Sequence, residues 1–268
     1  SIVRSLRGMT YCQIDVRGPS HDLHSGTFGG AVRNPAEALA TILAGLKDAH
    51  GRILVPGFYD DVVPLDDEQR TEMARVPFSD DEFMGDAGIS ATWGEAGYTV
   101  YEQTGARPTL EINGLYSGYI GDGAKTVLPA RAMAKVSMRL VANQDWQDIG
   151  RKFADYVQQL APPEVEVEVT MLHGGAPSMV DLTDPAMGAA SRAMGATWNA
   201  APVYTCEGGS IPVVSTFDQE LGINTVLMGF GLPDDRLHSP NEKFSLNQYH
   251  LGIATSIRFW YEYAAAMR

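Results

Sequence analysis

Strand-like and helix-like patterns follow one another in a restrictive order over the first two thirds of the chain. Four runs carry the alternating or β-branched side chains typical of strands, and two carry apolar side chains at helical spacing. The strand-like runs are residues 9–16, 110–113, 132–141 and 165–169, and the helical runs are residues 34–50 and 144–160. The order is therefore strand, helix, strand, strand, helix, strand.

That order is typical of a split βαβ, or ferredoxin-like, domain, which we place at residues 8–171. An irregular segment at about residues 52–107 is interpreted as an insertion, and its acidic runs as solvated faces. The remaining part, residues 172–268, contributes helices and one apolar strand at residues 225–230. A single strand cannot complete an α/β sheet, because a parallel strand needs neighbours on both sides. We therefore expect a mixed α/β (α+β) chain that ends in part of an α/β domain.

Composition excludes several classes of function. The chain has 268 residues with 20 basic and 33 acidic side chains, a net charge of −13, which argues against nucleic-acid binding. No run of 18 apolar residues exists, so no membrane partner is expected. Cys12 and Cys206 form neither a disulfide framework nor a CxxC metal motif, which favours a cytoplasmic location. We interpret the start at Ser1, within a strand-like run, as a cut.

Two features predict a binding site for an anionic group. The turn Gly208-Gly209-Ser210 exposes backbone N–H groups and one hydroxyl, which suit the anionic end of a ligand. Arg139 points away from the core near the end of its strand, where it either clamps a carboxylate or forms a surface salt bridge. The pattern does not separate these two roles.

Histidines occur in two polar loops. His238 lies beside Asn241 and Glu242 and is interpreted either as a functional imidazole or as the cap of the helix that follows. His21, Asp22 and His24 form a metal cluster, a substrate clamp or a solvated loop, and the residues alone favour the solvated loop.

Six stretches together resemble the M20 family of metallopeptidases, most closely its dipeptidase branch. They occur in the family's order across nearly the whole chain. The stretches are Asp22-Leu23-His24-Ser25-Gly26, Arg107-Pro108-Thr109-Leu110, Gly123-Ala124-Lys125-Thr126-Val127-Leu128-Pro129, Arg139-Leu140-Val141, Glu207-Gly208-Gly209-Ser210-Ile211-Pro212 and His238-Ser239-Pro240-Asn241-Glu242.

The resemblance implies a catalytic α/β domain with two divalent metal ions, zinc or manganese, bridged by a water or hydroxide. It also implies an inserted ferredoxin-like lid that forms a homodimer. His238 matches a metal ligand that lines the substrate site, and Arg139, with Gly209 and Ser210, matches the site for the substrate's carboxylate. His24 and Thr126 match lid residues that reach the partner's active site, where His24 stabilises the oxyanion.

The same resemblance implies that other ligands are missing from this chain. The family's two Asp, one His and one Glu ligands and its general-base Glu precede the stretches that match. We therefore interpret the chain as the lid plus the C-terminal part of a zinc-peptidase catalytic domain, which alone is inert and does not bind the metals stably. The expected parent function is hydrolysis of small peptides. The alternatives are a non-catalytic dimerisation or binding module, and an amidohydrolase that deacylates N-acyl amino acids.

Overall fold

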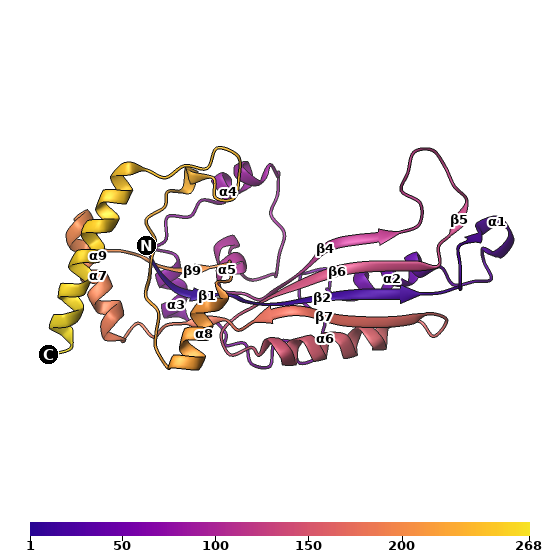
Figure 1. Ribbon diagram of the computed structural model, residues 1–268, viewed down its shortest axis with the longest axis horizontal. Helices are drawn as coiled ribbons and strands as arrows, with labels where there is room; N and C mark the ends of the chain where they lie inside the picture. The colour runs from indigo at the N-terminus through magenta and orange to yellow at the C-terminus, as the bar shows by residue number, and fades with distance from the viewer.

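The larger sheet has the topology that the sequence predicts. The computed structural model describes residues 1–268, except for the side chain of Pro233. Four antiparallel strands pair in the order β4-β6-β2-β7, which in chain order is 2-3-1-4 (Figure 1). Their bounds are Thr109–Ser117 for β4, Arg131–Leu140 for β6, Gly8–Arg17 for β2 and Glu166–Gly175 for β7. The order and the antiparallel pairing confirm the ferredoxin-like fold.

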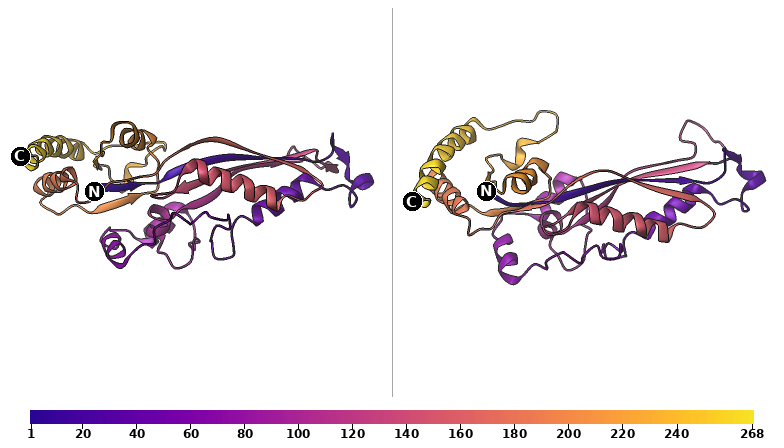
Figure 2. Two further views of the ribbon diagram at one scale, coloured as in Figure 1. Left: turned by 90° about the horizontal axis from the view of Figure 1, so that it is seen from below. Right: turned by 60° about the horizontal axis from the view of Figure 1, so that its bottom comes forward.

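Two helices cover one face of this sheet, as Figure 2 shows for α6. They are α2 (Pro35–Ala44), capped by the Asn34 side chain, and α6 (Trp146–Leu160), capped by Asp145. The prediction that the first helix reaches about residue 50 was wrong. Helix α2 ends at Ala44 with Gly45 as its C-cap, and a β-bridge between Lys47 and Ile53 follows. The core between sheet and helices is apolar, and its largest fully buried members include Ile14, Leu39, Ile42, Phe58, Leu110, Met138, Leu140, Ile149 and Phe153.

A second sheet is centred on the N-terminal strand β1 (Ile2–Leu6). It pairs in parallel with β9 (Tyr204–Glu207) and antiparallel with β10 (Leu227–Met228) and β8 (Ser178–Met179). The prediction of one lone strand at residues 225–230 was therefore wrong, because this sheet contains three more strands. The strand-like run at the N-terminus is β1, and the sequence pattern did not predict that it pairs with residues 227–228.

Helices α7 (Pro185–Trp198) and α9 (Leu246–Ala266) pack against each other beside this sheet (Figure 1). The small core beneath them is formed by Ile2, Val180, Met187, Ala190 and Met194. A further helix, α8 (Pro212–Leu221), follows the Gly-Gly-Ser turn.

The two sheets share one continuous stretch of chain, because β1 leads directly into β2 (Figure 1). The expected domain boundary at residues 171–172 falls inside β7, which extends to Gly175. The division into two domains stays a prediction.

Short elements connect these parts. Between α2 and β4 lie α3 (Asp67–Met73), α4 (Asp80–Ala87) and α5 (Val100–Gly105). At the far tip of the larger sheet, β3 (Leu23–His24) pairs with β5 (Val127–Leu128) and leads into α1 (Ser25–Phe28), and η1 (Pro233–Asp235) precedes α9. In the described part of the chain, none of the helices has the length and apolar character needed to span a bilayer.

Candidate functional site

Arg139 and Ser210 meet between the two sheets. Arg139 lies near the end of β6, and its Nη1 donates to Ser210 Oγ at 2.8 Å. Ser210 Oγ donates in turn to the backbone carbonyl of Arg7 at 2.6 Å. The single hydroxyl proton is thereby used, so Ser210 holds Arg139 through an oxygen lone pair. Among the described residues, the Arg139 guanidinium makes no ion pair within 4.0 Å, and its other N–H groups are available for a carboxylate.

The turn that carries Ser210 approaches its neighbours closely. A Cβ added at Gly208 would lie 2.6 Å from the Thr104 carbonyl oxygen, so only glycine fits there without a shift. A Cβ at Gly209 would meet open space, and this residue is exposed. Directly after the turn, α8 begins without a side-chain cap on its first N–H groups. Its first residue, Pro212, has no N–H group, and the Val214 N–H donates to the Ile211 carbonyl at 3.0 Å. The helix dipole favours an anion at this end of α8.

His24 and Thr126 come together at the opposite end of the larger sheet, near α1 (Figure 1). His24 is exposed and caps α1, with Nδ1 accepting from the Gly26 N–H at 3.1 Å. A neutral ring in this arrangement carries its proton on Nε2, which makes that atom a donor toward solvent. The backbone carbonyl of the exposed Thr126 accepts from the Ser25 N–H at 3.1 Å. These two residues therefore do not meet Arg139 within one chain.

His238 lies in a third place, in the turn between η1 and α9. It is exposed and adopts a left-handed backbone conformation, with φ of 61°. It does not cap the following helix, because Ser245 does so by accepting from the Gln248 N–H. This excludes the capping role that the sequence left open. In the described residues, the His238 side chain makes no hydrogen bond or ion pair.

Comparisons with known proteins identify the family of this chain. The family model described as "Peptidase dimerisation domain" of M20 peptidases matches residues 4–165. The chain belongs to the M20 peptidase family. The chain is 34% identical to the Cys-Gly metallodipeptidase DUG1 of Candida albicans, over 97% of this chain and 54% of that protein. It is 28% identical to the human Beta-Ala-His dipeptidase, over 98% of this chain and 53% of that protein. This M20 chain thus spans about half the length of the curated relatives it matches.

Solved structures give the same picture of the fold. The dipeptidase Dug1p of Saccharomyces cerevisiae superposes with a TM-score of 0.82 at 30% identity, over 98% of this chain and 56% of that one. The M20 metallo-carboxypeptidase Sso-CP2 of Sulfolobus solfataricus gives a TM-score of 0.87 at 28% identity, over 98% of this chain and 60% of that one.

The residues of this M20 chain do not by themselves fit a metal centre. Within the described residues, no group of three or more His, Cys, Asp or Glu side chains is placed to hold a metal ion. At the tip, Asp22 Oδ1 accepts from the Ala130 N–H at 2.9 Å, and His21 Nδ1 lies 2.9 Å from the Ser20 hydroxyl. A metal bound by His238 would need ligands from outside this set.

The sequence analysis did not predict that Arg7 contributes to this site. Arg7 stands between the two sheets and contacts the Gly-Gly-Ser turn through its side chain and its backbone. The only signal in the sequence is an arginine before Gly8 at the junction of two strand-like runs.

Proposed function

We propose that the chain supplies the carboxylate clamp and the dimer-forming lid of a metal-dependent dipeptidase. The observation that carries this is the contact of Arg139 with Ser210 beside the open N-terminus of α8. A dipeptide ends in a free carboxylate, and a guanidinium with unused N–H groups binds that group in a two-point fork. The relatives named for Cys-Gly and β-Ala-His cleavage support a small dipeptide as the substrate.

His24 acts in this proposal from a second copy of the chain. Its outward Nε2–H suits a developing oxyanion, but it lies at the opposite end of the sheet from Arg139 (Figure 1). In a twofold dimer formed through the lid, the end of the sheet that carries His24 in one subunit lies at the Arg139–Ser210 site of the other subunit. The match to a dimerisation domain supports this homodimer. Thr126, next to His24 at the tip, is proposed to contact the same substrate.

The metal part of the proposal concerns one residue. His238 is proposed as one ligand of a site for two divalent ions, zinc or manganese, and as a wall of the substrate pocket. Its exposed and unbonded side chain supports this role. Since the described residues do not complete such a site, we derive no reaction step through the metals.

The test is mixing of two inactive variants of the full-length protein. His24→Ala is expected to lower kcat by about 10²–10³-fold, the cost of one oxyanion donor, with unchanged metal content. His238→Ala is expected to be inactive through loss of metal. In a mixed dimer one site carries both changes and the other carries neither. Random exchange should thus restore about a quarter of wild-type activity, because about half the dimers are mixed and each has one intact site.

The control is His21→Ala, which alters an exposed histidine three residues from His24 and should leave activity unchanged. Failure to recover activity after verified subunit exchange would show that His24 does not act across a dimer. Cleavage of N-acyl amino acids but not of dipeptides would instead favour the amidohydrolase alternative.

A further inference from the structure

Arg7 holds the turn that carries Ser210 from both sides. Its Nε donates to the Gly208 carbonyl at 3.0 Å, and its backbone N–H donates to the Glu207 carbonyl at 3.3 Å. Its own carbonyl accepts the hydroxyl proton of Ser210. One residue therefore fixes the start, the middle and the end of the turn. Any movement of Arg7 must move the oxygen that holds Arg139.

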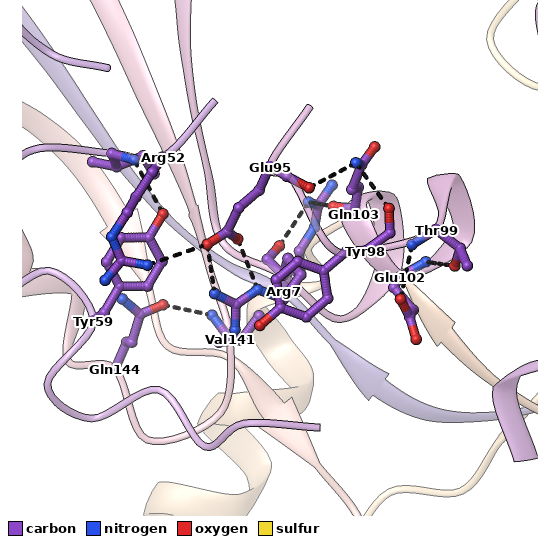
Figure 3. Close-up of polar contacts among 12 residues, drawn as sticks. Arg7, Arg52, Tyr59, Glu95, Tyr98, Thr99, Glu102, Gln103, Val141 and Gln144 are labelled. Atoms are coloured by element: carbon purple, nitrogen blue, oxygen red, sulfur yellow. Dashed lines mark hydrogen bonds and ion pairs between the residues drawn. The ribbon is translucent and has the colours of Figure 1, made fainter. Parts of the chain in front are cut away.

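The other end of the Arg7 guanidinium is anchored on the 52–107 segment. Nη1 donates to the carbonyl of Arg107 at 3.3 Å and lies 3.5 Å from that of Gln103 (Figure 3). These carbonyls lie at and just beyond the end of α5. The Gly-Gly-Ser turn is thus tied through Arg7 to the segment that the sequence analysis treated as an insertion.

The anchoring carbonyl of Arg107 is itself rigidly placed. The Arg107 guanidinium forms a two-point ion pair with Glu95, at 2.8 and 3.0 Å, and both side chains are at least nine-tenths buried. Its guanidinium carbon lies over two aromatic rings, with centroids at 5.5 Å for Tyr59 and 4.3 Å for Tyr98. Figure 3 shows Tyr59, Glu95 and Tyr98 around this point. Such a network holds the Arg107 carbonyl in place, and with it the guanidinium of Arg7 that is bonded to this carbonyl.

Arg7 also brings a charge that the described residues do not neutralise by direct contact. All its side-chain bonds go to carbonyl oxygens, and no described carboxylate lies within 4.0 Å. Burial lowers the pKa of Arg7 to about 10, with the nearby Arg139 charge acting in the same direction and Glu111 in the opposite one. Glu111 is itself paired with Lys47 at 3.2 Å. Arg7 therefore stays charged at neutral pH, and a carboxylate at Arg139 would meet both cations.

We propose that Arg7 is a positioning residue for the substrate's carboxylate, which sets the Gly-Gly-Ser turn and adds a second positive charge behind Arg139. The inference rests on the proposed function, since it concerns the same clamp. It assigns the 52–107 segment a part in substrate binding, because that segment fixes Arg7.

The first experiment compares two substrates in the full-length protein, a dipeptide and the same dipeptide with an amidated C-terminus. Arg7→Met is expected to raise KM for the free dipeptide about 10- to 100-fold, because displacing the turn weakens the charge-assisted contact of Arg139 with the carboxylate. The amide lacks the carboxylate, so its kcat/KM should change less than about threefold. Arg7→Lys keeps the positive charge but loses the several N–H donors of the guanidinium. Its KM for the free dipeptide should lie between those of the wild type and Arg7→Met. Arg17→Met, at the exposed far end of β2, is the matched control and should change neither substrate.

Equal losses for both substrates would overturn the proposal, because a purely structural role affects them alike. The second experiment needs no catalysis and uses crystal structures of this chain with Arg7→Met or, where that variant does not fold, Arg7→Lys. The contact of Arg139 with Ser210 is expected to be lost or lengthened, and an unchanged contact would exclude the positioning role. If the wild-type protein cleaves no dipeptide, the proposed function fails while the structures still decide the role of Arg7.

Discussion

At the scale of single residues, burial separates charges that look alike in the sequence. The acid-rich segment at residues 52–107 contains mostly solvated carboxylates, as expected, but Glu95 and Glu102 are buried and paired with Arg107 and Arg70. Glu102 also accepts the Thr99 N–H and so closes the capping box of α5. These two carboxylates join parts of the segment to one another, whereas most of the other carboxylates of the segment face water.

The Glu95 pair predicts a large effect on stability. Glu95→Gln leaves the Arg107 guanidinium buried without its counter-charge and should cost about 3–5 kcal/mol of unfolding free energy. Glu72→Gln alters the solvent-facing pair with Arg75 and should cost less than about 1 kcal/mol. Urea denaturation of both variants measures the difference. Similar values for the two would show that the Glu95 pair is not buried in solution.

At the scale of elements, the start of α6 is stabilised by side chains close to it in the sequence. Asp145 caps it, and Asp148 in its first turn pairs with Lys152 at 2.8 Å and Arg151 at 3.1 Å. The hydrogen bond from Lys152 is the largest cause that lowers the pKa of the Asp148 carboxyl. A carboxylate here also interacts favourably with the helix dipole.

This arrangement predicts a small dependence of stability on pH. The folded pKa of Asp148 lies below the ordinary value of 3.8, so its contribution is complete above that pH and is lost as the pH falls through the folded value. Because the side chain is about one-third exposed, Asp148→Asn should cost only about 0.3–1 kcal/mol at pH 7, and this cost should shrink as the pH falls below 3.8. Asp155→Asn, on an exposed position of the same helix, is the control. A constant difference between pH 7 and pH 2, measured by urea denaturation, would contradict the assignment.

At the scale of the whole molecule, the two sheets are joined through β1 and β2 and through the end of β7. The main core is confined to residues 12–157, beneath the larger sheet. Beyond it, α9 exposes Ile253, Ile257 and Trp260, an apolar face that lies outside that core. The proposed division therefore leaves the lid with a complete core of its own.

The division predicts how truncated chains behave. Residues 8–176 should fold cooperatively, because they keep the whole core and all of β7. Residues 8–171 lose the pairing of β2 with residues 173–175 and the stacking of Tyr11 on His173, and should be less stable by about 1–3 kcal/mol. Circular dichroism with urea compares the two chains. Non-cooperative unfolding of residues 8–176 would show that the lid needs the second sheet.

The sequence by itself determined the larger sheet and its two helices. These strands and helices are long enough to show a periodic pattern of apolar residues, and local residues mark where they begin. Alternation over residues 165–169 and the start of the first helix at residue 34 depend only on neighbours along the chain. Alternation over residues 132–141 likewise placed Arg139 on the face away from the core. The late end of the first helix was wrong because its pattern continued past Gly45, where the chain turns into a bridge.

Only the tertiary structure decided the second sheet and the contact of Arg139 with Ser210. Strands β8 and β10 have two residues each, too few for any period, and the partners of β1 lie 172–226 positions further along the chain. The contact of Arg139 with Ser210 spans 71 positions and that of Arg7 with Ser210 spans 203. Local patterns identify which residues have suitable chemistry, but long-range pairing sets which of them meet and which atom receives the single proton of Ser210.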